Sequence, residues 1–175
     1  MLALTAFAIK AANGDVPAIA PADFQAGLLM GYYGVDVKTD METCFGEDQE
    51  IADATDAFIA ALKAKDWTQV ENTIKEFIPK TEDRVKACET DQYSTIHHMY
   101  DNQSDTVKAA KADPDWQLKI LKIVMKSKAD ITGGVADAET KWDSGDYYGA
   151  GEAIGKVERM VADPWFIPLP TSFLQ

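Results

Sequence analysis

Residues Trp116 to Met125 read WQLKILKIVM. Apolar side chains fall on most faces of a helix formed by this stretch, which is typical of a helix buried on several sides. Asp113 and Pro114 precede it, and a cap residue followed by proline is a common helix start. The stretch therefore predicts a central helix against which other helices pack.

Helical patterns continue towards the amino terminus. Asp66 and Gln69 have the spacing of a capping box, and the helix that they open carries one apolar stripe. The stripe is formed by Trp67, Val70, Ile74 and Phe77. Residues 13–22 contain glycine and two prolines, which predicts an extended linker. Asp23 is then expected to cap a short helix that ends at Gly34.

Towards the carboxyl terminus, Asp146 predicts the cap of a final helix. On that helix Gly151 and Gly155 lie four residues apart, which lets another backbone approach closely. Breaks are expected at residues 101–104 and 133–134. No stretch shows the alternation of a strand. The sequence therefore predicts an all-α fold, an antiparallel helical bundle of about five to six helices with extended terminal arms.

The bundle domain is expected at residues 23–162, with an apolar arm on each side. The N-terminal arm and linker span residues 1–22. MLALTAFAI at its start resembles part of a signal peptide but lacks a preceding basic residue, so the chain begins inside a longer precursor or packs this segment as an arm. The tail, residues 163–175, has three prolines, which forbid a helix. Its apolar side chains are Trp165, Phe166, Ile167, Leu169, Phe173 and Leu174. These are too many for a free end, so the tail either folds back or inserts into a partner.

The composition limits the class of partner. The 175 residues suffice for one domain with a sizeable core, and 17 Lys and Arg against 29 Asp and Glu give a formal net charge of −12. Phosphate backbones repel such a surface, so nucleic acid is not an expected partner. Beyond the N-terminal stretch, no segment approaches the length of a transmembrane helix. Lys119, Lys122 and Lys126 form a basic stripe that either pairs with carboxylates of a neighbouring helix or docks an acidic partner or a like subunit.

No group of residues has the spacing of a catalytic or metal site. His97 and His98 are adjacent and point to different faces of a helix, and no nucleophile completes a triad with Asp101. A partial calcium-loop spacing is interrupted by Lys38 and Met41. We therefore predict no enzymatic activity, no metal and no cofactor.

Two features bear on the cellular compartment. Cys44 and Cys88 either pair with each other or are small buried side chains, because two thiols alone cannot close a zinc site. Asn102 opens an N-glycosylation sequon, Asn-Gln-Ser, which favours a secreted protein.

The segment at residues 129–156 carries a wider pattern. It combines Asp130-Ile131, Trp142, Gly145-Asp146-Tyr147-Tyr148, Gly151 and Gly155, preceded by Phe24 to Gly27 and Gly34 to Asp36. Across residues 24–161 this pattern resembles small, secreted, all-helical proteins of ciliates whose function is uncharacterised. The resemblance implies secretion and a Cys44–Cys88 bridge, and it implies no enzymatic activity.

These features favour a non-enzymatic structural or interaction protein. We expect a subunit of a larger extracellular or lumenal assembly, either a homo-oligomer or a multi-subunit complex, joined through its terminal arms. One alternative is a soluble carrier that holds an apolar ligand between aromatic side chains, namely Trp67, Trp116, Trp142, Tyr147 and Tyr148. Another is an accessory subunit of a membrane-bound complex with unpaired cysteines. An enzyme of unfamiliar type ranks last.

Overall fold

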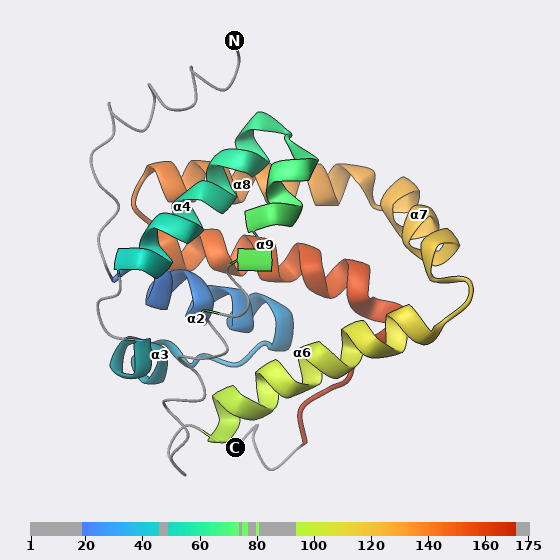
Figure 1. Cartoon of the computed structure of the whole chain (residues 1–175), viewed down its shortest axis with the longest axis horizontal. Helices are drawn as coiled ribbons and strands as arrows, with labels where there is room; N and C mark the ends of the chain where they lie inside the picture. The colour runs from blue at the N-terminus through green and yellow to red at the C-terminus, as the bar shows by residue number, and fades with distance from the viewer. Residues whose placement is uncertain (1–18, 46–48, 74, 77–79, 81–93, 171–175) are drawn as a thin grey trace.

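A computed structural model describes residues 19–45, 49–73, 75–76, 80 and 94–170, and these are entirely without β-strands (Figure 1). The all-α class is therefore confirmed for this part of the chain. The helices are α2 (Ala20–Tyr33), α3 (Lys38–Phe45), α4 (Gln49–Ala64), α6 (Ser94–Ala112), α7 (Trp116–Lys126), α8 (Lys128–Asp143), α9 (Tyr147–Ala162) and the 3-10 helix η2 (Asp163–Trp165).

A close pairing of α2 with α9 forms the centre of the fold (Figure 1). A Cβ atom added to Gly151 or Gly155 of α9 would lie 2.0 or 2.1 Å from a backbone oxygen of α2. Gly27 and Gly31 of α2 meet the backbone of α9 in the same way, at 1.9 and 2.2 Å. Because no side chain fits in such a contact, these four glycines set the separation of the two helices.

The α2–α9 pair is parallel. Gly151 lies against Phe24, and Gly155, one turn further along α9, lies against Leu28, one turn further along α2. The prediction of an antiparallel bundle is therefore wrong for this pair. It holds for α8 and α9, which a tight turn at Gly145 joins as a hairpin.

Two apolar clusters lie on either side of α2. The first joins α2, α3 and α6 and contains Leu29, Met41 and Met99, all with no exposed surface. The second joins α2, α4, α8 and α9, where the ring centroids of Phe24 and Trp142 are 5.6 Å apart. As a result, α2 is buried along most of its length.

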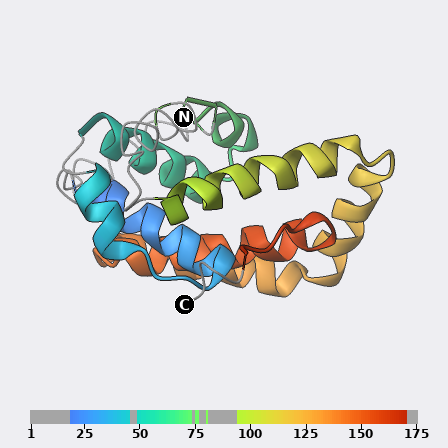
Figure 2. The ribbon, with the colours of Figure 1, turned by 90° about the horizontal axis from the view of Figure 1, so that it is seen from below.

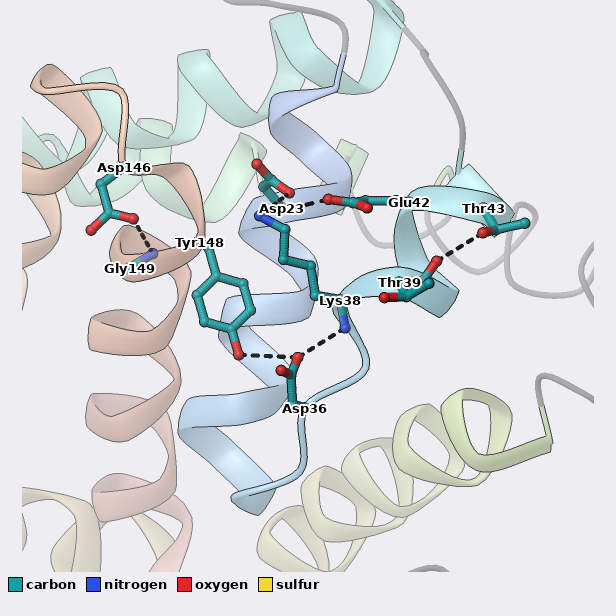
Figure 3. Close-up of polar contacts among 9 residues, drawn as sticks. All are labelled: Asp23, Asp36, Lys38, Thr39, Glu42, Thr43, Asp146, Tyr148 and Gly149. Carbon is teal, nitrogen blue, oxygen red and sulfur yellow. Dashed lines mark hydrogen bonds and ion pairs between the residues drawn. The ribbon is translucent and has the colours of Figure 1, made fainter.

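The helix ends follow the local signals in the sequence. Gly34 ends α2 in the left-handed conformation, with φ of 76°. The backbone N–H of Gln69 donates to Asp66 at 3.0 Å, and that of Gly149 donates to Asp146 at 2.9 Å (Figure 3). These caps satisfy N–H groups that the helix itself leaves without partners.

Several predicted breaks are absent. Helix α2 begins at Ala20, with Pro21 in its first turn, so residues 20–22 are buried helix and not linker. Helix α6 continues through residues 101–104, and α8 continues through residues 133–134. Tertiary packing therefore overrides the weak local preferences at these places. The described residues hold seven labelled α-helices, against the five to six expected.

The predicted position of α7 is also wrong. Instead of a central helix, α7 lies at the edge of the molecule, and none of its residues is buried (Figures 1 and 2). The central place is taken by α2, whose glycines and alanines let it pack close to α9. An apolar pattern indicates that a helix has apolar side chains to bury, but not that other parts of the same chain bury them.

Candidate docking surface

The apolar side chains of α7 lie on two opposite faces. Ile120 and Ile123 are half-buried and face the protein. We name the other face the outer face of α7. Its residues are three and four positions apart, which places them on one side of the helix. The outer face consists of Leu118, Leu121, Val124 and Met125, with exposed fractions of 50, 54, 38 and 72%. Single exposed leucines are ordinary, but four large apolar side chains together on one helix typically mark an interaction site.

The basic stripe runs beside the outer face of α7. Lys119 forms an ion pair with Asp113, so the pairing alternative is correct for this lysine. Lys122 and Lys126 form no ion pair with any residue that the structure describes. Residues 116–129 contain no acidic side chain, although the chain carries a net charge of −12. The region is therefore a local basic surface on an acidic protein.

Polar contacts hold both ends of α7. At its start, the Asp113 carboxylate accepts hydrogen bonds from the Lys119 ammonium and from the indole N–H of Trp165 at 2.9 Å. With the backbone N–H of Asp115, these donors lower the pKa of Asp113 to about 2. At the end of α7, the backbone N–H of Ser127 donates to the carbonyl of Ile123, and α8 begins at the next residue. The outer face therefore belongs to a helix whose start is held by side-chain contacts.

A pocket of about 450 Å³ opens behind the C-terminal half of α7, between α7, α9 and η2. Its basic residues are Lys126, Lys156 and Arg159. Lys156 pairs with Glu152 at 2.6 Å and Arg159 pairs with Asp163 at 2.8 Å, so both charges are locally balanced. Lys126 links this pocket to the outer face of α7.

The described part of the tail folds back onto its own chain. Leu169 is 6% exposed inside the first apolar cluster, and the Phe166 ring centroid lies 5.4 Å from that of Tyr32 on α2. The indole N–H of Trp165 donates to Asp113, and the backbone N–H of Ile167 donates to the Thr106 hydroxyl of α6. The fold-back alternative therefore accounts for these four residues, and their predicted role as interface residues gains no support. Phe173 and Leu174 lie outside the described residues.

The residues that bear on secretion are placed only in part. Cys44 has an interaction partner, but Cys88 lies outside the described residues, so the pairing of the two stays a prediction. Asn102 lies within α6, and its side-chain nitrogen donates to the carbonyl of Pro168 at 3.3 Å. A glycan on this nitrogen would compete with that hydrogen bond, which ties α6 to the tail.

A polar cluster joins α3 to α2 and α9 (Figure 3). The Lys38 ammonium lies 3.1 Å from Asp23 and 3.6 Å from Glu42, and the Tyr148 hydroxyl donates to Asp36 at 3.3 Å. The ion pair with Asp23 raises the pKa of Lys38, and desolvation raises that of Tyr148 to about 12. Both groups therefore keep their protons at neutral pH. This is expected of side chains that hold α3 against α2 and α9, and not of a general base.

Among the described residues, the other titratable side chains form no arrangement typical of catalysis. His97 lies 3.3 Å from Asp101, one turn further along α6, and both side chains reach solvent. Glu158 on α9 is exposed to solvent, where its carboxylate keeps its hydration. Within the described residues, no group of three or more His, Cys, Asp or Glu side chains is arranged to hold a metal.

The aromatic residues suggested for a carrier do not share one cavity. Trp142 is 5% exposed and packs edge-on against Tyr147, with ring centroids 4.9 Å apart, whereas Trp67 is 66% exposed. Neither these residues nor Trp116 lines the pocket behind α7. The carrier alternative therefore has no observation in its favour here.

Comparison with protein-family models, curated proteins and solved structures finds no match to this chain. The resemblance to ciliate proteins accordingly stays a prediction. Among the described helices, none combines the length and hydropathy that crossing a bilayer requires.

Proposed function

We propose that the protein is a non-enzymatic interaction protein that docks onto its partner through the outer face of α7. The observation that carries this proposal is the exposure of four large apolar side chains on a helix with no buried residue. Covering them would contribute on the order of 4 kcal/mol, taking about half of the 1.5–3 kcal/mol of a fully buried side chain for each. The two lysines without ion pairs add charge that a partner of opposite sign would use.

In this proposal the protein belongs to a larger assembly, and α7 replaces the C-terminal tail as a point of attachment. Support for the replacement comes from the tail side chains up to Leu169, which pack on helices of the same chain. Residues 1–18 and the end of the tail at residues 171–175 keep the role proposed for the arms.

Photo-crosslinking in the native cells tests the docking surface. A benzoylphenylalanine in place of Met125 should crosslink to a partner. The same group in place of Trp67, which is also apolar and exposed, serves as the matched control. Crosslinking at position 125 and not at 67 supports the proposal. Equal crosslinking at both positions, or crosslinking of position 125 to neither protein nor lipid, contradicts it.

We further propose a secreted or lumenal location with a Cys44–Cys88 bridge and a glycan on Asn102. The support is the sequon and the resemblance to secreted ciliate proteins. Intact mass spectrometry of the native protein, with thiols alkylated before and after reduction, tests both modifications. Alkylation only after reduction, with mass lost on deglycosylation, agrees with the proposal. Two thiols alkylated at once on a bare polypeptide would instead favour the accessory subunit of a membrane-bound complex.

A further inference from the structure

We infer that the partner of the outer face of α7 is the surface of an anionic lipid bilayer. This inference rests on the proposed function, because it names what that docking surface binds. Three observations carry it: the geometry of α7, the charge around it and its place in the molecule.

The geometry favours a flat partner. Ile120 and Ile123 are half-buried, so α7 offers a partner its remaining, exposed sides. With 11 residues α7 is about 16 Å long, so its outer face offers roughly 160 Å². A stable protein interface needs about 800 Å² from each partner, whereas a bilayer imposes no such minimum.

The charge favours anionic headgroups. Residues 116–129 contain four lysines, at positions 119, 122, 126 and 128, and no acidic side chain. Lys122 and Lys126 lie on α7 beside the outer face, whereas Lys119 is paired with Asp113. Long lysine stems let the ammonium groups reach lipid phosphates while Leu121 and Met125 enter the boundary of the acyl chains.

The position of α7 lets it meet a bilayer at one edge of the molecule, although Asp113, Asp115 and Asp130 flank it in the sequence. A net charge of −12 includes four positive charges from these lysines, so the other residues together carry −16. Repulsion between exposed charges is screened beyond about 8 Å at physiological ionic strength. Both views place α7 at one edge of the molecule, where it can meet a surface first (Figures 1 and 2).

Vesicle sedimentation with the full chain tests this inference. The protein should bind vesicles of equal parts phosphatidylcholine and phosphatidylserine and should not bind vesicles of phosphatidylcholine alone. Each lysine near an anionic surface contributes about fivefold in affinity, so Lys122→Gln with Lys126→Gln should weaken binding about 25-fold. Lys75→Gln with Lys108→Gln removes the same charge from other helices and should leave binding unchanged.

The apolar contribution needs its own variant. Leu121→Asp with Met125→Asp should abolish binding to the mixed vesicles, while Trp67→Asp should not. Thermal unfolding followed by circular dichroism confirms that each variant is folded, and Leu118→Gln replaces the double variant if it is not. Absence of binding, equal binding to both kinds of vesicle, or binding insensitive to the α7 variants overturns the inference.

The crosslinking experiment separates this inference from the proposed function. If Met125 crosslinks to a protein and the mixed vesicles are not bound, α7 is a docking surface and the lipid partner is wrong. If neither is observed, the docking function itself is wrong.

Discussion

Four glycines decide how closely α2 and α9 approach. Gly27 and Gly31 face Gly151 and Gly155, and every one of them meets backbone atoms of the opposite helix. The contacts at backbone oxygens leave no flexible side chain that could move aside. Any larger residue must therefore push the two helices apart, which also disturbs the two apolar clusters that flank α2.

Gly151→Ala is expected to lower the free energy of unfolding by about 3 kcal/mol or more, near the upper end of overpacking costs. Gly133→Ala is the matched control on α8, because an added Cβ there meets nothing within 4 Å. Alanine is the better helix former, so this variant should gain up to about 1 kcal/mol. Urea unfolding measures both. Equal effects of the two substitutions would mean that α2 and α9 are not in backbone contact.

For single residues, the sequence predicts the capping residues and one side of the α2–α9 contact, the glycines of α9. Asp66, Asp146 and Gly34 act as their types and positions indicate, since a cap depends on neighbours within four residues. Gly151 and Gly155 were recognised as a place of close approach. Their partner helix could not be identified, because α2 lies more than a hundred residues earlier in the chain.

Among the elements, α7 is the one whose burial the sequence misjudges. Its apolar residues are continuous enough to predict a central helix, yet Leu121 and Met125 point away from the described protein. Periodicity shows which positions are apolar but not which are covered. The mismatch between an apolar sequence and an exposed position is what identifies the candidate site, so it could be recognised only once the fold was known.

An uncovered outer face predicts an unusual tolerance of polar substitution. Leu121→Gln should change the free energy of unfolding by less than about 0.5 kcal/mol, as at ordinary surface positions. Ile59→Ala, at a residue that is 1% exposed, should cost about 2–5 kcal/mol. Urea unfolding of the two variants checks this. A loss of several kcal/mol at position 121 would mean that another part of the chain covers α7.

The attachment of the tail to the start of α7 should depend on pH. The Asp113 pKa of about 2 lies below its ordinary value of 3.8 because Lys119, the Trp165 indole and the Asp115 backbone stabilise the carboxylate. A lowered pKa stabilises the folded chain while the group is charged. Its contribution is therefore complete above about pH 4 and is lost as the pH falls towards 2.

Asp113→Asn tests this pH dependence. The difference in unfolding free energy between the natural chain and the variant should be constant from pH 7 to about pH 4 and should shrink below it. Urea unfolding followed by tryptophan fluorescence at several pH values measures the difference. A difference that does not change with pH would show that the charge of Asp113 plays no part in attaching the tail.

In the whole molecule, the all-α class follows from the sequence, whereas the arrangement of the helices does not. Class depends on periodicity within each segment, which the chain shows clearly. The parallel α2–α9 pair and the return of Leu169 to the first cluster join distant segments. Neither contact leaves a local pattern, and the sequence therefore left open whether the tail folds back.

The folded-back tail leads to a prediction for the stability of the whole molecule. Leu169 packs in the cluster that joins α2, α3 and α6, so Leu169→Ala should cost about 2–5 kcal/mol. Removing residues 163–175 should destabilise the chain further, because the bonds of Trp165 to Asp113 and of Asn102 to Pro168 are lost as well. Ending the chain after Pro170 keeps all of these contacts and is the matched control.

Urea unfolding together with the molar mass in solution separates the two roles of the tail. Loss of stability in the first two variants at unchanged molar mass means that the tail serves its own bundle. An unchanged stability with a smaller molar mass would contradict the folded-back tail and return the assembly contact to it. In the first case α7 remains as the helix with exposed apolar side chains among the described residues. Assembly or membrane attachment should then respond to α7 variants and not to Leu169→Ala.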